Sequence, residues 1–311
     1  MERDNAQHQL IVSSESPLRI ESRYARENTV TLFPGDCMEL LTEVPDGEAD
    51  LVVTSPPYNL GKEYEQRIDL DAYVDQQTRV IRECVRVLSD RGSLCWEVGN
   101  YVDRGTITPL DAVLYPVFVE AGLKMRNRIV WQFGHGLHCS RRFSGRYEVI
   151  LWFTKTNDYI FELDPVRVPQ KYPGKKHFKG PKAGQYSGNP KGKNPGDVWE
   201  VPNVKANHVE KTEHPCQFPV ELIERLVLSM TRNRSLVIDP FMGVGTSAIA
   251  ALRHGRRAAG AETMPKYVEI ARERLLLESA GMLPTRPMDR PIHKPSGREN
   301  VVQSPWKGLW K

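Results

Sequence analysis

The chain has 311 residues, 40% of them apolar, and is long enough to bury the core of one large α/β domain or two small ones. No apolar stretch reaches the length of a membrane span, residues 1–20 lack a signal-peptide core, and the five scattered cysteines lack the CxxC spacing of a zinc or redox site. The sequence therefore argues against a membrane-spanning or disulfide-stabilised protein and predicts a reducing, cytoplasmic setting.

The net charge of +4 is unevenly distributed. Residues 165–213 hold ten Lys or Arg against four Asp or Glu, and residues 280–311 hold six against two. The remainder of the chain is therefore net acidic. Positive charge gathered in two segments fits a polyanionic partner better than the overall figure suggests.

After a polar extension, residues 1–28, the first half of the chain alternates between strand and helix patterns. The predicted strands are residues 30–33, 49–54, 93–98, 127–133 and 147–154. The predicted helices are residues 37–42, 71–88 and 109–122. The last two strands are close enough in sequence to suggest an antiparallel pair at an edge of the sheet.

The strand over residues 49–54 ends abruptly at Ser55-Pro56-Pro57-Tyr58. Neither proline can donate to a sheet ladder, and the residues before them are biased toward extended conformations, so a stiff loop is predicted at the carboxyl end of this strand. Open α/β sheets bind ligands at such ends. The loop offers a hydroxyl, free carbonyls and an aromatic ring, which suit an exocyclic amine of an extruded base stacked on Tyr58.

Residues 155–213 lose all periodicity. Gly, Pro, Lys and Asn dominate, and aromatic residues are interleaved among the lysines, an arrangement in which rings stack on bases while lysines meet phosphates. We interpret this segment as a loop-rich recognition lobe in preference to a disordered insertion. The basic loop before it carries Arg141 and Arg142.

Periodicity returns at His214. Helices are predicted over residues 220–230, 246–254 and 265–279, with strands over 235–239 and 257–262. Residues 281–311 are rich in Pro and Arg and are predicted to be partly disordered, with Trp306 and Trp310 as candidates for docking the tail back or contacting a partner.

The turn from Asp239 to Thr246 joins a strand to a helix and contains Gly243 and Gly245, which allow close backbone approach to a ligand. Glu262 ends the next strand, where an acid holds ribose hydroxyls. A nicotinamide dinucleotide fits part of this pattern, but the third glycine is missing and Asp239 would repel a pyrophosphate. A cofactor with a ribose and a cationic amino-acid end fits better, and S-adenosylmethionine has both.

These motifs resemble those of the amino-directed DNA methyltransferases, which methylate N4 of cytosine or N6 of adenine. The family's catalytic motif is similar to Ser55–Tyr58, and its Phe-x-Gly-x-Gly cofactor motif is similar to Phe241–Gly245. The His-Pro-x-Gln-x-Pro segment matches residues 214–219. The catalytic motif precedes the cofactor motif with the variable segment between them, an order that resembles the β group of the family.

The resemblance implies an α/β, Rossmann-like S-adenosylmethionine-dependent methyltransferase with a mainly parallel seven-stranded mixed sheet, one antiparallel strand and helices on both faces. It divides the chain into an N-terminal extension (1–28), a catalytic half (29–154), a target-recognition lobe (155–213), a cofactor-binding half (214–279) and a basic tail (280–311).

The resemblance also assigns site residues. The catalytic residues are Ser55, Pro56, Pro57 and Tyr58. The cofactor-binding residues are Asp36, Gln217, Pro219, Asp239, Phe241, Gly243, Gly245, Thr246 and Glu262. The candidate DNA-binding residues are Arg141, Arg142, Lys175, Lys176, Lys191 and Lys193. On its own, Asp36 is typical of a turn or a helix N-cap.

The implied reaction is direct transfer of a methyl group to the exocyclic amine of a flipped base, with no covalent enzyme–base intermediate and no metal. Serine at the first motif position favours N4 of cytosine, with N6 of adenine as the alternative. The implied partner is double-stranded DNA, without membrane contact. A separately encoded restriction endonuclease, as in restriction-modification, and a homodimer are left open.

Three rivals compete with this interpretation. Pro215-Cys216-Gln217 and Glu299-Asn300-Val301 resemble motifs of cytosine C5 methyltransferases, but here the cysteine precedes the cofactor turn, against that family's order. A non-catalytic DNA-binding protein is disfavoured because the catalytic loop, cofactor turn and ribose acid are all present. Methylation of RNA or of a protein glutamine is disfavoured by the basic lobe and the serine.

Overall fold

A computed structural model describes residues 18–292, except 64, 135 and 137, together with residue 296. Within these residues a nine-stranded mixed sheet has the order β1-β2-β11-β10-β3-β4-β8-β7-β9. β8 pairs antiparallel with both of its neighbours, and all other pairs are parallel. The sheet is thus the predicted one, with a short strand added at each edge.

The strands of this sheet are β1 (Ile20–Glu21), β2 (Val30–Phe33), β3 (Ala49–Thr54), β4 (Leu88–Val98), β7 (Lys124–Gln132), β8 (Tyr147–Thr154), β9 (Val198–Glu200), β10 (Leu236–Asp239) and β11 (Arg257–Ala261). The helices are α1 (Cys37–Glu43), α2 (Leu70–Val87), α3 (Leu110–Glu120), α4 (Val220–Met230), α5 (Thr246–Arg253) and α6 (Pro265–Ser279). A 3-10 turn, η1, covers Asp164–Val166.

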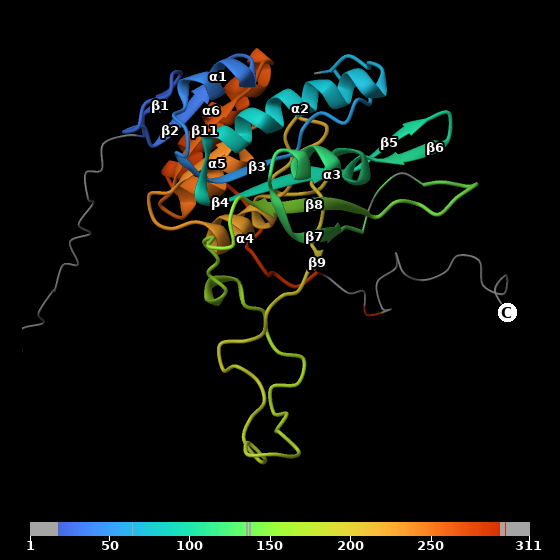
Figure 1. Ribbon diagram of the computed structural model, residues 1–311, viewed down its shortest axis with the longest axis vertical. Coiled ribbons are helices and arrows are strands. Elements are labelled where there is room, and N and C mark those ends of the chain that lie inside the picture. The colour runs from blue at the N-terminus through green and yellow to red at the C-terminus, as the bar shows by residue number, and fades with distance from the viewer. Residues whose placement is uncertain (1–17, 64, 135, 137, 293–295, 297–311) are drawn as a thin grey trace, which may run out of the picture.

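Helices cover both faces of the sheet, α1 to α3 on one and α4 to α6 on the other (Figure 1). Because successive strand residues point to opposite faces, β3 supplies both layers. Leu51 and Val53 pack with α4 to α6, whereas Val52 packs with α1 to α3. Burial on both faces explains why the parallel strands are continuous apolar runs.

The predicted helices and strands are confirmed, with two differences beyond the added edge strands β1 and β9. No loop separates the predicted helix over residues 71–88 from the predicted strand over 93–98, because β4 begins at Leu88, directly after α2, and changes register against β3. A separate hairpin of β5 (Asn100–Asp103) and β6 (Thr106–Pro109) was not predicted. Its turn places Arg104 and Gly105 at positive φ, which this Asp-Arg-Gly-Thr sequence signals only weakly.

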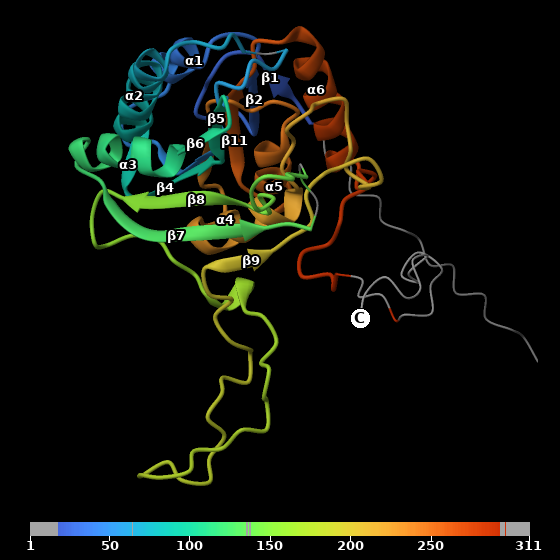
Figure 2. The same cartoon turned by 90° about the vertical axis from the view of Figure 1, so that its right-hand side faces the viewer.

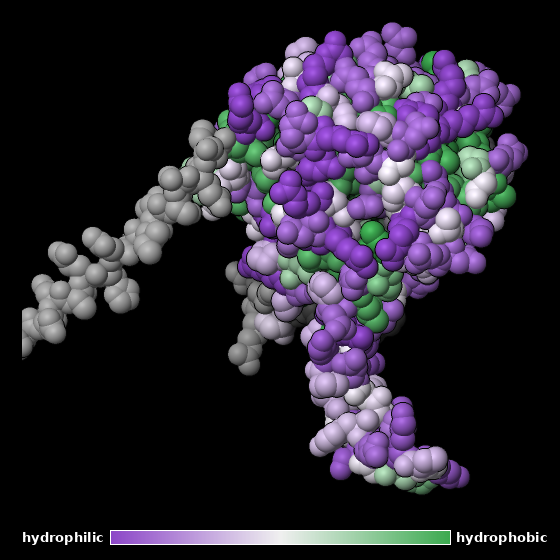
Figure 3. Space-filling model, turned by 60° about the vertical axis from the view of Figure 1, so that its left-hand side comes forward, coloured by the Kyte–Doolittle hydropathy of each residue, from purple (hydrophilic) through white to green (hydrophobic). Residues whose placement is uncertain are grey.

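The segment 155–213 divides into a packed base and a protruding arm. Val166, Trp199, Val201 and Val204 are buried against the body. Residues 167–197 project from the body as a long irregular loop whose outgoing and returning segments run side by side, and we name this loop the arm (Figures 1 and 2). In the space-filling view the arm is narrow and mainly hydrophilic (Figure 3).

The start of the basic tail, which was predicted to be disordered in part, docks on α4. Arg286 is 9% exposed and pairs with the buried Glu221, and Arg225 on the same helix pairs with Asp289. The buried Glu210 accepts hydrogen bonds from the backbone N–H groups of Arg286 (3.0 Å) and Val220 (2.9 Å), so it joins the tail to the start of α4. Trp306 and Trp310 lie outside the described residues.

In the part of the chain that the structure describes, no helix combines the length and apolarity needed to cross a bilayer.

We predict that Arg286→Ala lowers the free energy of unfolding by about 3 kcal/mol, because it leaves the Glu221 carboxyl buried without its partner. Chemical denaturation measures this. The matched control is Arg290→Ala, which removes an exposed arginine from the same tail and should change stability by less than about 0.5 kcal/mol. Equal stability of the two variants would show that the tail does not depend on this pair.

Candidate active site

The candidate site lies where the parallel strands end at one edge of the sheet. Asp36 follows β2, Glu262 follows β11, the glycine turn follows β10, and Ser55–Tyr58 follow β3. Carboxyl ends of neighbouring parallel strands meet at the same edge. The sheet order places β3 beside β10, although the motifs that follow them are more than 180 residues apart in sequence.

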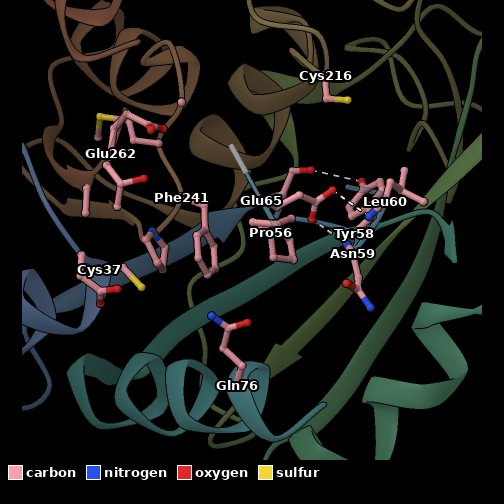
Figure 4. Close-up of a pocket in the computed structure, with 18 of the residues that line it drawn as sticks. Cys37, Pro56, Tyr58, Asn59, Leu60, Glu65, Gln76, Cys216, Phe241 and Glu262 are labelled. Carbon is pink, nitrogen blue, oxygen red and sulfur yellow. Dashed lines mark hydrogen bonds between the residues drawn. The ribbon is translucent and has the colours of Figure 1, made fainter. Parts of the chain in front are cut away.

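A cavity of about 570 Å³ opens at this edge, within the range of about 300–1,000 Å³ that is typical of small-molecule sites. Figure 4 shows Glu262 and Cys37 at one side, Pro56 and Tyr58 at the other, and Phe241 between them. The predicted site residues that line the cavity are Asp36, Ser55, Pro56, Pro57, Tyr58, Gln217, Phe241, Gly243, Thr246 and Glu262.

Three predicted cofactor residues do not line the cavity. Pro219 precedes the first turn of α4, and Gly245 faces α6, where an added Cβ would approach the Ala271 Cβ to 3.2 Å. Asp239 is 1% exposed and turned inward, so the predicted repulsion of a pyrophosphate by its carboxylate is wrong. The six candidate DNA-binding side chains are all exposed and lie outside this cavity.

The catalytic loop is held by residues that sequence inspection missed. The Tyr73 hydroxyl on α2 donates to the Pro57 carbonyl over 2.9 Å. Asn59, at φ +59°, exchanges two hydrogen bonds of 2.7 Å with the backbone of Ile68, and the Glu65 carboxylate accepts from the Asn59 and Leu60 amides. The loop is therefore fixed by side-chain bonds as well as by its prolines.

Behind the loop, Tyr58 meets two acidic side chains. Its hydroxyl donates to Glu97 Oε2 over 2.5 Å and lies 3.1 Å from the Ser55 hydroxyl. Burial raises the pKa of Tyr58 well above its ordinary value, and the charges of Glu148 and Glu97 raise it further. Burial also raises the pKa of Glu97 and, more strongly, that of Glu148, which faces Glu97 from β8.

The cofactor side of the cavity has the parts that a nucleoside with a cationic amino-acid end requires. Gly243 has φ +54° and faces the His214 ring, which an added Cβ would approach to 3.4 Å. Glu262 keeps a carboxylate at the cavity wall while its Oε1 accepts from the Met264 amide over 2.7 Å. Asp36 caps α1 and also lines the cavity, so both of its expected roles are geometrically available.

His214 and the segment around it close the cavity from the α4 side. The His214 ring packs edge to face on Tyr267, with centroids 4.6 Å apart, and the Tyr267 hydroxyl donates to Glu63 in the loop after the catalytic motif. Burial lowers the pKa of His214 to about 4, so the ring is neutral near pH 7. Tyr267 on α6 therefore contacts both the segment before α4, through His214, and the loop after Tyr58, through Glu63.

Asp239 joins the ends of β10 and β3. Its Oδ1 accepts from the Thr54 hydroxyl over 2.5 Å and from the Phe241 amide over 3.1 Å, while its Oδ2 accepts from the Ser247 hydroxyl. Burial raises the pKa of Asp239 to about 6, against these hydrogen bonds, which lower it. Asp239 thus holds both ends of the glycine turn, through Phe241 and Ser247.

Among the described residues, no group of three or more His, Cys, Asp or Glu side chains is arranged to hold a metal ion. Cys216 is exposed at the cavity wall, whereas Glu299-Asn300-Val301 lie outside the described residues.

Comparisons with known sequences agree on one class of protein. A sequence model of a DNA methylase family matches residues 49–273. The Type II methyltransferase M.BglII of Bacillus subtilis is 50% identical over 260 residues, covering 83% of this chain and 72% of the relative. M.ScaI of Streptomyces caespitosus, also a Type II methyltransferase, is 37% identical over 268 residues, covering 83% and 85%. The DNA adenine methyltransferase YhdJ of Escherichia coli K12 is 30% identical over 257 residues, covering 79% and 82%.

Solved structures share the architecture. TTHA0409 from Thermus thermophilus, complexed with S-adenosyl-L-methionine, aligns with a TM-score of 0.57 and 31% identity, covering 80% of this chain and 96% of that one. The PvuII cytosine-N4-specific DNA methyltransferase aligns with a TM-score of 0.62 and 20% identity, covering 81% and 92%. The second likeness concerns the fold alone.

We predict that Asp239 makes the protein less stable as pH rises. A buried acid whose folded pKa of about 6 exceeds its unfolded pKa, about 4, holds its proton more tightly when folded, so its contribution is lost between about pH 4 and pH 6. The free energy of unfolding of the wild type, relative to that of Asp239→Asn, should fall by about 2 kcal/mol between pH 4 and pH 7. Denaturant titrations at both pH values measure this, and a pH-independent difference would contradict it.

Proposed function

The chain belongs to the DNA methylase family of S-adenosylmethionine-dependent amino-methyltransferases, and from that premise we propose that it methylates N4 of a cytosine flipped out of double-stranded DNA. One observation carries the proposal. The Ser55–Tyr58 loop and the Phe241–Gly243 turn line a single cavity, so an amine held at the first lies beside a methyl donor held at the second.

Each cavity wall has a role in this proposal. Glu262 accepts from ribose hydroxyls, Asp36 lies at the adenine end, and Gly243 leaves room for the amino-acid end. Bound S-adenosylmethionine supplies an electrophilic methyl group on a sulfonium. Ser55 and the Pro56 carbonyl accept hydrogen bonds from the target amine, which favours a nitrogen with a free lone pair, and positioning in the cavity supplies much of the acceleration.

Cytosine is preferred because a neutral serine opens the catalytic motif. Adenine is the second candidate, supported by the name of one relative, a DNA adenine methyltransferase that is 30% identical to this chain. The two bases offer a similar amine on their pairing edge and differ in size, since cytosine is a single ring and adenine a fused pair of rings. A cognate restriction endonuclease, a homodimer and a cytoplasmic location stay predictions.

The arm is proposed to contact the DNA backbone outside the cavity. Lys175, Lys176, Lys191 and Lys193 are all exposed on it. Three exposed rings accompany its lysines, since Lys171 lies over Tyr172, Lys176 over Tyr186 and Lys179 over Phe178, with 5.2 to 5.9 Å between each ammonium nitrogen and the ring centroid. Such pairs keep aromatic faces and positive charge together on one surface.

Product identification tests the function. The protein is incubated with sequence-diverse unmethylated DNA and labelled S-adenosylmethionine, and the DNA is digested to nucleosides and separated. The proposal expects label in N4-methylcytosine. Label in N6-methyladenine would establish the second candidate, and label in 5-methylcytosine or in no nucleoside would contradict both.

Gly243→Val should abolish binding of S-adenosylmethionine, because the side chain would enter the cavity toward His214. Calorimetry should show affinity weakened by at least about 100-fold, the loss of about 3 kcal/mol. Gly47→Val is the matched control, since Gly47 also has positive φ, +68°, but an added Cβ there meets nothing within 4 Å. Equal losses in both variants would show that backbone strain alone weakens the binding.

Replacing two arm lysines, as in Lys175→Gln/Lys176→Gln, should reduce the salt dependence of DNA binding. Each phosphate contact contributes about 0.9 to the slope of log K against log salt concentration, so the slope should become shallower by about 2. Fluorescence anisotropy over a salt series measures it. Lys124→Gln on β7, also exposed, should leave the slope unchanged. An unaltered slope in the double variant would place the arm outside the interface.

A further inference from the structure

A line of hydrogen bonds runs from the cavity into the body of the protein. It begins at the Ser55 hydroxyl on the cavity wall, passes over 3.1 Å to the Tyr58 hydroxyl, and continues over 2.5 Å to Glu97 Oε2 at the end of β4. Glu97 is only 3% exposed. The line therefore joins a surface that faces the substrate to a buried carboxyl.

The chemistry of the groups gives this line a direction. A carboxylate only accepts hydrogen bonds, so the single proton of the Tyr58 hydroxyl points to Glu97. The Tyr58 oxygen then accepts, and the Ser55 hydroxyl donates to it. With its proton turned toward Tyr58, the Ser55 oxygen can present only lone pairs to the cavity.

Glu148 lies against Glu97, and the two carboxyl groups compete for a single negative charge. The two carboxyl groups face each other from the neighbouring strands β4 and β8, and two carboxylates in contact do not both ionise. Burial and the neighbouring Glu97 raise the pKa of Glu148 well above its ordinary value, and of the two carboxyl groups it is Glu97 that accepts from the Tyr58 hydroxyl, so the single negative charge of the pair is assigned to Glu97. Glu97 also receives the Tyr58 bond, which favours its ionised form.

The space beside the pair is closed. A Cβ added at Gly99 would lie 3.0 Å from Tyr58 Cε2 and 3.4 Å from both Cγ and Oε1 of Glu148. The other oxygen of Glu97, Oε1, is buried without a hydrogen bond of ordinary geometry within the described residues. The titratable groups that face this region from the remaining side are Lys205 and Cys216, in the segment before α4.

We infer that Glu97 is a positioning residue that acts through Tyr58, making Ser55 a hydrogen-bond acceptor for the target amine and receiving the proton that this amine loses. The inference rests on the proposed function, which it deepens. It also gives Tyr58 a second task beside stacking on the base.

The proton balance is complete within these groups. Once the amine nitrogen is methylated it carries a positive charge, and one N–H bond breaks with its electron pair returning to nitrogen. That proton bonds to the Ser55 oxygen, the Ser55 proton passes to the Tyr58 oxygen, and the Tyr58 proton passes to Glu97. Glu97 ends as a neutral carboxylic acid, and no oxidant, metal or further reactant is needed.

Single-turnover methyl transfer across a pH series tests this inference. The full chain is used with saturating S-adenosylmethionine and sequence-diverse unmethylated DNA, in the wild type, Glu97→Gln and Tyr58→Phe. Glu97→Gln keeps the shape of the side chain but cannot take the proton, and Tyr58→Phe keeps the ring but breaks the line. Glu120→Gln, exposed at the end of α3, is the matched control.

Both variants should lower the transfer rate by about 100-fold, the usual scale of acid–base assistance, with unchanged calorimetric affinity for S-adenosylmethionine. The wild-type rate should fall on the acid side as Glu97 takes a proton, and this limb should vanish in Glu97→Gln. The double variant should be no slower than either single one, because both interrupt the same line.

A wild-type rate with the acid limb intact in Glu97→Gln would overturn the inference, as would effects that multiply in the double variant. These outcomes differ from failure of the proposed function, in which the wild type itself transfers no methyl group to DNA.

Discussion

The buried hydrogen bond between Thr54 and Asp239 marks the constraint on which the site depends. It ties the ends of β3 and β10, which pair in parallel at the centre of the sheet. Parallel neighbours end at one edge, so a catalytic loop and a cofactor turn from distant parts of the sequence must share a cavity. A chain that paired these strands differently would carry every motif and have no site.

The same edge concentrates buried acidic groups. Burial raises the pKa of Asp239, Glu97 and Glu148 together, and each costs stability when it ionises. Hydroxyls offset part of that cost, from Thr54 and Ser247 at Asp239 and from Tyr58 at Glu97. These buried carboxyl groups lie behind the cavity wall in a partly dry setting, where electrostatic effects are larger than in water.

The sequence predicted the sheet and its helices well, because strands buried on both faces are continuous apolar runs. Ten of the thirteen residues predicted to be catalytic or cofactor-binding line the cavity, since short motifs at strand ends indicate which residues meet at one edge of the sheet. Sequence inspection missed Tyr73 and Glu65, which hydrogen-bond the loop after β3, and Glu97, which accepts from Tyr58, because these contacts follow no motif and form only in the folded chain. It also misjudged the direction of the Asp239 side chain, because strand periodicity does not tell whether a terminal side chain faces a ligand or the core. The ion pairs that dock the start of the tail on α4 are tertiary contacts that no sequence pattern indicates.

The most direct test of the account is a crystal structure with S-adenosylhomocysteine bound. The account predicts the ribose against Glu262, the sulfur facing the Ser55–Tyr58 loop, and room between sulfur and loop for one methyl group and one amine nitrogen. A sulfur turned away from Tyr58, or separated from Ser55 by a wall of side chains, would contradict the central claim that the two motifs act on one pair of reacting atoms.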